Sequence, residues 1–327
     1  MVKSRIMKNP IALFLLTFLF ISGCKADTTE KINNGISPAQ IIKTIDKGKP
    51  VLVSGMIITE DLNFSEIKNQ VVFSSSQRIA IVDVPVTFIN CIFMGKVSAN
   101  GQKDKSQVNT HFKSSITFEA CDFRADAMFD NMTVDGMANF TGAIFREKAL
   151  FNNVTFKGRQ TYFTAFSSEK LFSMQESKVE GAIDFFKGKV TGKLSFQSTD
   201  FWGEARFSDL DCNGKSEFSL TNFRSDALFT YANFGSEFRM SNTTVAGRLD
   251  MISVDFQTNA WLTNAVFNGK VNFTKTKAKA NFDLSGSLFV LGNPVMDEFE
   301  VLSPGLLITN GTKCTVNNEF EKINDKQ

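Results

Sequence analysis

The chain of 327 residues has one histidine, two tyrosines and two tryptophans, and its 36 basic residues nearly balance its 34 acidic ones. The single histidine, His111, lies in a polar stretch and excludes histidine-rich metal sites and catalytic histidine pairs. The net charge of +2 gives neither the positive field that attracts nucleic acid nor the acidic surface that imitates it. We therefore expect no nucleic-acid partner.

Cysteine is also scarce, and its spacing fits no zinc motif. Apart from Cys24, the chain contains Cys91, Cys121, Cys212 and Cys314, which we expect to be small buried hydrophobic residues. A disulfide between Cys91 and Cys121 remains an alternative if they lie on stacked layers in an oxidising compartment. No glycine-rich phosphate loop is present, so the sequence predicts no cofactor.

Long hydrophobic runs are absent, and the one apolar run, residues 11–21, is too short to span a bilayer. It follows a basic segment and precedes Ile21-Ser22-Gly23-Cys24, which resembles the bacterial lipobox. The resemblance implies that residues 1–23 are a lipoprotein signal peptide and that Cys24 is acylated. An ordinary secretory signal that contains a cysteine is the alternative.

Residues 24–36 are short and polar and are expected to form a lipid-anchored tether that reaches roughly 20 Å. Multiple acyl chains on one residue give stable membrane attachment. Lys25 stands where enterobacterial lipoproteins retained in the inner membrane carry Asp, so the resemblance favours the outer membrane of a bacterial cell envelope.

Phenylalanine, with 35 copies, is the residue that organises the chain. Apolar residues recur at alternating intervals of five and six, a period that neither a helix nor a strand can hold. Such a repeat indicates a solenoid whose chain turns a corner at each step. In the longest unbroken stretch these positions are Met174, Val179, Phe185, Val190, Phe196, Phe201, Phe207, Cys212, Phe218, Phe223, Phe229, Phe234, Met240, Val245, Met251, Phe256, Leu262, Phe267 and Phe273.

Strings such as Ala138-Asn139-Phe140-Thr141-Gly142 and Ala227-Leu228-Phe229-Thr230-Tyr231 resemble the pentapeptide-repeat family over residues 80–290. The resemblance implies an all-β fold, a right-handed quadrilateral parallel β-helix in which the central residue and the one two before it point inward. The chain departs from the family because every second side has six residues. We therefore expect about 22 residues per coil, with the extra residue widening two corners.

The repeat is expected to lie between two caps. Residues 37–79 form the predicted N-terminal cap, with a helix near 38–47 that starts at the Ser37-Pro38-Ala39-Gln40 capping signal and is followed by short strands. Residues 98–111 are predicted to be a polar loop, and the repeat slips by one residue near 162–173. Residues 291–327 form the predicted C-terminal cap and tail, with a hairpin around Asn310-Gly311.

One outward column carries the candidate interaction surface, Glu204, Asp226, Arg248 and Lys270, on successive coils. Glu204 and Asp226 have the adjacency of a glycosidase carboxylate pair. The basic residues that follow instead favour a solvated charge ladder. We expect no enzymatic activity and no catalytic or metal site.

Three functions remain. The first is a non-catalytic, lipid-anchored scaffold or interaction protein of the cell envelope. Its partners would be the membrane through the anchor, an envelope protein or glycan, and a second copy through a solenoid end. The alternative is a carbohydrate-binding or carbohydrate-active β-helix protein, for which Trp202 and Trp261 are the outward aromatic candidates. The gyrase-binding DNA mimicry of some pentapeptide-repeat proteins is the third, and it conflicts with the charge and the lipobox.

Overall fold

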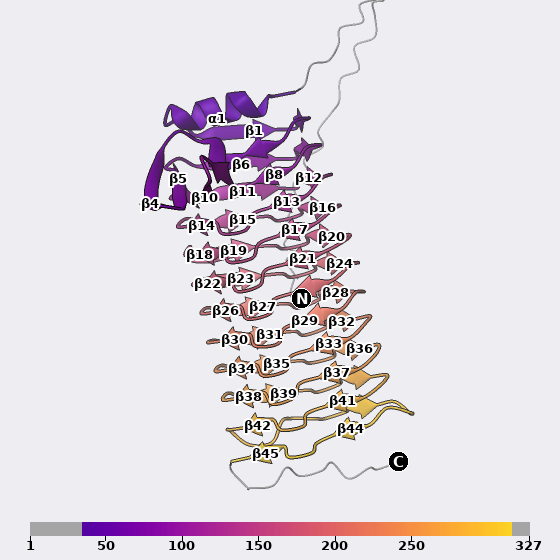
Figure 1. Cartoon of the computed structure of the whole chain (residues 1–327). Helices are drawn as coiled ribbons and strands as arrows, with labels where there is room; N and C mark the ends of the chain where they lie inside the picture. Colours follow the sequence, from indigo (N-terminus) through magenta and orange to yellow (C-terminus); the bar gives the residue numbers. More distant parts are fainter. Residues whose placement is uncertain (1–34, 316–327) are drawn as a thin grey trace, which may run out of the picture. The chain divides into compact units, whose positions relative to one another are not determined.

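The computed structural model describes residues 35–315, a folded unit of parallel sheets that stack coil upon coil (Figure 1). The predicted signal peptide, Cys24 and most of the tether lie outside the described residues, as does the predicted tail 316–327. Within the described part, four sheets form the four sides of a parallel β-helix, as the repeat predicts.

The helix α1 (Pro38–Asp46) covers the first coil. Its start follows from the capping box, in which the Gln40 amide donates to Ser37 Oγ and the Ser37 amide donates to Gln40 Oε1, each at 3.3 Å. Ile41 and Ile45 are buried against the coil beneath. The predicted capping helix is thus confirmed, and it shields the apolar interior at this end.

Each regular coil contributes one strand to each of the four sheets, which we number in chain order. The first sheet contains β1 (Val51–Ser54), β6 (Val86–Ile89), β11 (Ile116–Glu119), β15 (Ala138–Asn139), β19 (Gln160–Tyr162), β23 (Ala182–Asp184), β27 (Ala205–Arg206), β31 (Ala227–Leu228), β35 (Leu249–Asp250) and β39 (Val271–Asn272). The second contains β2 (Ile57–Ile58), β7 (Ile92–Phe93), β12 (Asp122–Phe123), β16 (Ile144–Phe145), β20 (Ser167–Ser168), β24 (Lys189–Val190), β28 (Asp211–Cys212), β32 (Asn233–Phe234), β36 (Asp255–Phe256), β40 (Lys277–Ala278) and β43 (Glu300–Val301).

The third sheet contains β3 (Leu62–Asn63), β8 (Val97–Ser98), β13 (Ala127–Met128), β17 (Ala149–Leu150), β21 (Phe172–Ser173), β25 (Leu194–Ser195), β29 (Ser216–Glu217), β33 (Phe238–Arg239), β37 (Ala260–Trp261), β41 (Phe282–Asp283) and β44 (Leu307–Ile308). The fourth contains β4 (Gln70–Ser74), β5 (Gln77–Val82), β10 (Ser106–Phe112), β14 (Thr133–Val134), β18 (Thr155–Phe156), β22 (Lys178–Val179), β26 (Asp200–Phe201), β30 (Asn222–Phe223), β34 (Thr244–Val245), β38 (Val266–Phe267), β42 (Leu288–Phe289) and β45 (Lys313–Cys314), with β9 (Asn100–Lys103) beside β10. A short 3-10 helix, η1 (Phe64–Glu66), follows β3.

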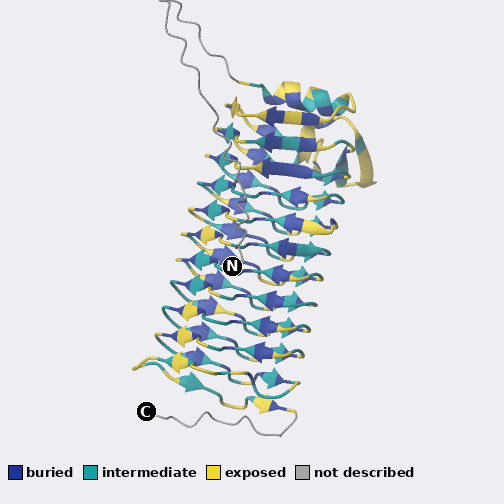
Figure 2. Ribbon diagram, turned by 180° about the vertical axis from the view of Figure 1, so that it is seen from behind, coloured by how far each residue is buried: buried dark blue, intermediate teal, exposed yellow. Residues whose placement is uncertain are grey.

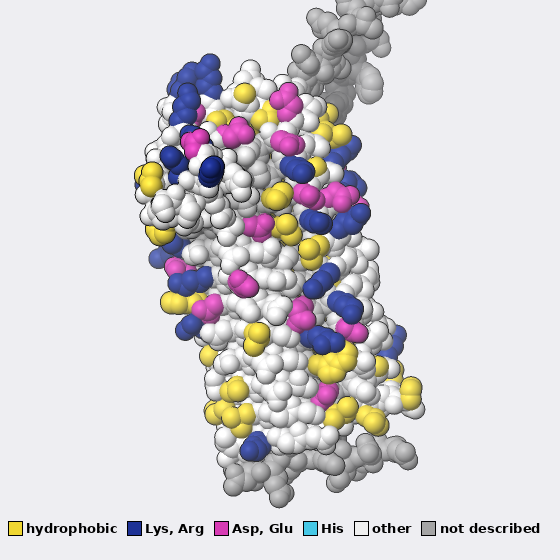
Figure 3. Space-filling view, viewed as in Figure 1, with side chains coloured by type: hydrophobic (Ala, Val, Ile, Leu, Met, Phe, Trp, Pro, Cys, Tyr) yellow, Lys and Arg dark blue, Asp and Glu magenta, His cyan; other side chains and the backbone are white. Residues whose placement is uncertain are grey.

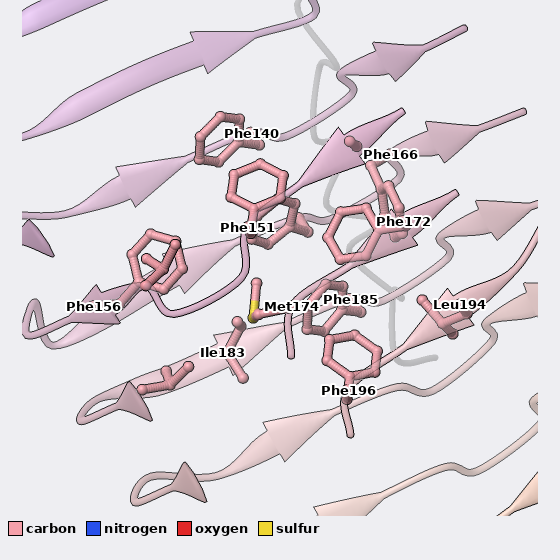
Figure 4. Close-up of a cluster of buried hydrophobic side chains, with 14 of the residues drawn as sticks. Phe140, Phe151, Phe156, Phe166, Phe172, Met174, Ile183, Phe185, Leu194 and Phe196 are labelled. Atoms are coloured by element: carbon pink, nitrogen blue, oxygen red, sulfur yellow. The ribbon is translucent and has the colours of Figure 1, made fainter. Parts of the chain in front are cut away.

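The interior is a set of phenylalanine ladders. Every apolar repeat position from Met174 to Phe273 is buried. The Phe207 ring stacks on Phe229, with centroids 4.8 Å apart and planes at 13°, and on Phe185 at 5.1 Å and 5°. Figure 4 shows neighbouring rings from several coils meeting in one core. Each buried ring contributes roughly 1.5–3 kcal/mol, and it does so only when the coils are in register.

The alternation of five and six residues corresponds to two kinds of corner. The five-residue steps, from first to second sheet and from third to fourth, each contain a residue with positive φ, such as Asp209 (54°) and Leu220 (60°). The six-residue steps have no such residue in the regular coils, and backbones of successive coils come very close there. A Cβ added at Gly214 would collide with the Gly192 carbonyl oxygen. At the six-residue corners, the sixth residue therefore lets the chain turn without a residue in the left-handed conformation.

The first coils differ from the prediction. β1, β2 and β3 already pair in parallel with β6, β7 and β8, so the solenoid starts near Val51, well before residue 80. The predicted polar loop 98–111 is wrong, because these residues include β9 and β10, joined by a two-residue turn at Asp104 and Lys105, both with positive φ. β10 pairs with β5 and continues the fourth sheet.

The C-terminal hairpin is also wrong. β44 pairs in parallel with β41 and β45 pairs in parallel with β42, so the two strands belong to different sheets and form a last coil. Inter-coil pairing thus outweighs the local turn signal of Asn310-Gly311. The predicted one-residue slip of the repeat is confirmed, but the extra residue falls between Phe156 and Thr161. The interval from Ala138 to its register partner Thr161 is one residue longer than the interval from Thr133 to its partner Thr155.

Candidate functional site

The four predicted surface residues lie on one corner, between the fourth and first sheets, on four successive coils. Each immediately precedes a first-sheet residue, and those residues, Ala205, Ala227, Leu249 and Val271, are register partners. Glu204, Arg248 and Lys270 are exposed, and Asp226 is half-buried. We call this line of residues 204, 226, 248 and 270 the corner column.

Arg248 organises the corner column. Its Nη2 lies 3.3 Å from Asp226 Oδ2 and its Nε lies 3.1 Å from Asp250 Oδ2. The Arg248 amide also donates to Asp226 Oδ1 at 2.8 Å. Because Asp226 Oδ1 accepts a hydrogen bond from the Arg248 amide and Oδ2 pairs with the Arg248 guanidinium group, Asp226 is held as an ion-pair partner. This arrangement does not suit a glycosidase pair of Glu204 and Asp226, in which one carboxyl must stay available to water or sugar.

Glu204 and Lys270, at the two ends of the column, form no ion pair within residues 35–315. They are therefore the charges on this corner that a partner could engage without first breaking an internal pair. The column presents, in order along the coils, an open carboxylate, a neutralised pair and an open ammonium group.

Trp202 lies beside the corner column. Its contacts with charged residues of three coils were not predicted from the sequence. Its indole Nε1 donates to Asp200 Oδ2 at 2.7 Å. Lys178, from the preceding coil, and Arg224, from the following coil, lie 4.0 and 4.8 Å from the ring centroid. Cations from both neighbouring coils thus contact the aromatic ring. A sugar that stacks on Trp202 would have to displace them.

Asp200 links this cluster across coils. Arg224 donates to its two oxygens at 2.8 and 2.9 Å, and Asn222 donates at 3.0 Å. Burial alone would raise the pKa of Asp200, but the hydrogen bonds from Arg224 and Trp202 outweigh it and hold that pKa below its ordinary value. Asp200 and Arg224 are one coil apart along the chain, so the repeat itself contains the signal that brings the two side chains together.

His111, expected in a solvated loop, belongs to β10 and joins a similar ladder. Its Nε2 lies 2.8 Å from Asp135 Oδ2, and Lys157 Nζ lies 3.0 Å from Asp135 Oδ1. Burial acts to raise the pKa of Asp135, yet hydrogen bonds from Lys157 and His111 lower it overall. His111 thus takes part in a charge ladder, in which its partner is the carboxylate of Asp135 and not a serine or cysteine side chain.

Cys91 and Cys121 lie on adjacent coils, as stacking predicts, but both are free thiols. Their Sγ atoms contact backbone carbonyl oxygens at 3.4–3.5 Å. The hydrogen bond with Cys91 and burial raise the pKa of Cys121, so this thiol is a poor nucleophile. No group of three potential metal ligands occurs in the described part of the chain.

Two hollows on the described surface are lined mostly by charged residues. The larger, about 620 Å³, lies between α1 and the first coil and is lined by charged residues of both signs, including Lys43, Asp46, Glu60 and Lys68. The smaller, about 230 Å³, lies on the third sheet next to the Lys215–Glu237 ion pair. Of the described helices, neither has the length and apolar character needed to cross a bilayer.

A second surface feature, missed by sequence reasoning, projects from the first coils. The antiparallel hairpins β4–β5 and β9–β10 lie side by side because β5 pairs with β10, and together they extend the fourth sheet. We call these two hairpins the hairpin wing. Figure 2 shows β4 as an exposed strand beside the first coils. The sequence signal for the first hairpin is a pair of runs rich in β-branched and apolar residues, separated by Ser74-Ser75-Ser76.

Comparison of the chain with protein-family models, with curated proteins and with solved structures finds no match. The function must therefore be argued from the chain and its fold alone.

Proposed function

We propose that the protein is a non-catalytic, lipid-anchored scaffold of the bacterial cell envelope. In this proposal Cys24 carries the acyl chains, the outer membrane is the site of attachment, and the solenoid presents a fixed pattern of side chains to an envelope protein or glycan. The pentapeptide-like repeat supplies the rod, and the lipobox resemblance supplies the anchor.

The observation that carries the scaffold proposal is the pairing of outward charges between coils. Arg146 bridges Asp122 and Glu169 from neighbouring coils at 2.8 and 3.0 Å, and Arg224 holds Asp200 in the same way. Figure 3 shows charged side chains of both signs along the coils. Such pairs fix the spacing and orientation of surface groups, and a partner that reads shape and charge needs this rigidity.

The corner column is the proposed partner surface. Glu204 and Lys270 offer the open charges, and Arg248 holds the residues between them in place. Carbohydrate binding is less well supported, because cations contact the Trp202 ring and Trp261 lies on a different side, beside Arg239 at 4.5 Å. Two aromatics on separate sheets do not form one sugar platform.

The anchor is tested by Cys24→Ala in the native host. We expect an unprocessed precursor that labelled palmitate does not mark, whereas the wild type should be labelled. Labelling of the variant to the wild-type level would contradict acylation at Cys24. Fractionation of the wild type between the two membranes checks the outer-membrane assignment.

The partner surface is tested with a photo-crosslinking residue at position 270, compared with one at Lys189, an exposed position on the second sheet. We expect a discrete cross-linked product from position 270 in cells and none from 189. The Lys270→Glu variant should lose partner capture while its unfolding temperature changes little, because this side chain is exposed and exposed charges contribute little to stability. Equal cross-linking at both positions would contradict this surface.

Enzymatic turnover by the purified protein would overturn the proposal of a non-catalytic scaffold. Purified protein should release no product from acidic polysaccharides or peptidoglycan fragments. Reproducible cleavage that is lost in Glu204→Gln would establish the carbohydrate-active alternative instead.

A further inference from the structure

The hairpin wing has an apolar strand that the protein itself leaves uncovered. In β4, Val71, Val72 and Phe73 are 45%, 68% and 69% exposed. Successive residues of a strand point to opposite faces, so three exposed residues in a row mean that both faces of this strand are open. β4 is also the terminal strand of the fourth sheet.

Soluble proteins protect an edge strand of this kind with charge, proline or a covering segment. β4 has no charge or proline within Gln70–Ser74, and no described segment lies on its outer edge. Its pairing with β5 does shift register between Val72 and Ser74, a bulge that interrupts the edge without covering the apolar side chains. Many outward positions of the regular coils carry paired charges, whereas β4 has three exposed apolar residues in succession. This continuous apolar strand calls for an occupant.

Basic residues lie next to the apolar strand. The β9–β10 turn carries Lys103 and Lys105, both exposed, with Asp104 between them, so that the turn is net positive. The Gln107 amide donates to the Ser76 carbonyl oxygen at 2.9 Å, which holds the ends of the two hairpins together. Figure 3 shows hydrophobic side chains over β4 near basic side chains. Apolar groups flanked by lysine suit the interface of an anionic lipid bilayer.

The proposed anchor is attached to the coil that carries this wing, on a different side of that coil. Gly35 bridges Ile57 of β2, in the same coil from which β4 and β5 project. Cys24 precedes Gly35 by 11 residues (35 − 24), a segment that spans at most about 40 Å when fully extended. An anchor at Cys24 would thus keep the first coil close to the membrane.

We propose that the hairpin wing inserts Val71, Val72 and Phe73 into the interfacial region of the anionic bilayer that holds Cys24. The wing is then a second membrane contact, which fixes the direction in which the solenoid leaves the surface. This inference rests on the proposed lipid anchor and adds to it the lipid surface as the partner of a defined protein segment.

The test supplies the anchor chemically. The mature chain, residues 24–327, is coupled through Cys24 to a maleimide lipid in vesicles that contain phosphatidylglycerol. The other four cysteines are buried and should not react. Phe73→Trp reports on the wing, and Tyr231→Trp, at a position 63% exposed on a regular coil, is the matched control. Vesicles with brominated acyl chains quench indoles that enter the bilayer.

We expect the emission added by Phe73→Trp to shift to shorter wavelength and to be mostly quenched, and the emission added by Tyr231→Trp to remain. Without the tether, Lys103→Gln and Lys105→Gln should each weaken vesicle binding about fivefold, whereas Lys189→Gln, at an exposed position on the second sheet, should not. Quenching at neither position, or equally at both, would overturn the proposal. So would a concentration-dependent blue shift at position 73 without vesicles, which would indicate a second copy on β4.

Because the tether is chemical, this result is independent of acylation in cells. A failure here with normal palmitate labelling refutes the wing contact alone. Quenching at position 73 together with absent labelling would refute the anchor while the wing still binds lipid.

Discussion

The first two coils and the regular coils share one core but differ in length and surface. In the first sheet, the chain runs from Val51 to Val86 and then to Ile116 between successive register partners, whereas the shorter run from Ala205 to Ala227 completes a regular coil. Most of the added residues form the hairpin wing. The regular coils cover themselves with ion pairs, and the wing exposes an apolar strand.

This difference shows that core continuity and surface function are set by separate residues. Phe88 and Phe118 stack at 5.1 Å across the long interval just as Phe207 and Phe229 stack across the short one. An insertion is tolerated because it leaves the inward positions in register, and a long surface insertion costs little loop entropy. The first coils can therefore carry an added surface element, the hairpin wing, without disturbing the rod.

The largest effect that tests this comparison comes from two phenylalanines. Phe207→Ala should lower the free energy of unfolding by about 3–5 kcal/mol, because the ring is buried between Phe185 and Phe229. Phe73→Ala, in the exposed strand, should change it by less than about 0.5 kcal/mol. Urea denaturation of both variants measures the difference. Similar losses at both sites would mean that the wing is part of the core.

A smaller loss is expected where backbones of successive coils meet. Gly214→Ala should destabilise the protein by about 1–3 kcal/mol, because the new methyl group would collide with the Gly192 carbonyl. Ser236→Ala, at the equivalent position of the next coil, should be nearly neutral. If the two variants unfold at the same temperature, the backbones of successive coils do not pack closely at the six-residue corners.

The surface ladders should contribute still less. Arg224→Gln should cost less stability at neutral pH than Gly214→Ala, since Arg224 is half exposed and water screens its pairing. The pKa of Asp200 is lowered in the folded state, so its contribution is present above the unfolded value of about 4 and is lost as pH falls through the folded value. Stability measured from pH 7 to pH 3 should fall less steeply in Arg224→Gln than in the wild type. Parallel curves would contradict the pairing.

The smallest effect concerns the cysteines. Reducing agent should leave the urea midpoint of the wild type unchanged, because Cys91 and Cys121 are free thiols. A thiol reagent should modify the buried cysteines only after unfolding. A loss of about 2–4 kcal/mol on reduction would instead reveal a disulfide between the coils.

The regular coils could be predicted from sequence because one residue type occupies the interior. Phe201 and Phe223 occupy the same place in successive repeats and stack on each other, as the repeat requires. The cross-coil pair of Asp200 and Arg224 follows from the same spacing, although the sequence does not indicate which neighbour each charge selects. That choice depends on side-chain reach and on competing partners such as Trp202.

The wing escaped prediction for two physical reasons. Residues 98–111 are polar, which obscured the alternation in which Val108, Thr110 and Phe112 point inward and their neighbours outward. The exposure of β4 could not be read from Val71-Val72-Phe73, because an apolar run predicts burial. The side chains are exposed because β4 lies at the end of its sheet, where neither of its faces is covered.

Amide hydrogen exchange on the vesicle-tethered mature chain tests most directly whether the wing, rather than the rod, meets the membrane. We expect slower exchange for Val71–Ser76 on anionic vesicles than for the untethered protein, with the corner column from Glu204 to Lys270 unchanged. Protection of the corner column with β4 unaffected would contradict it.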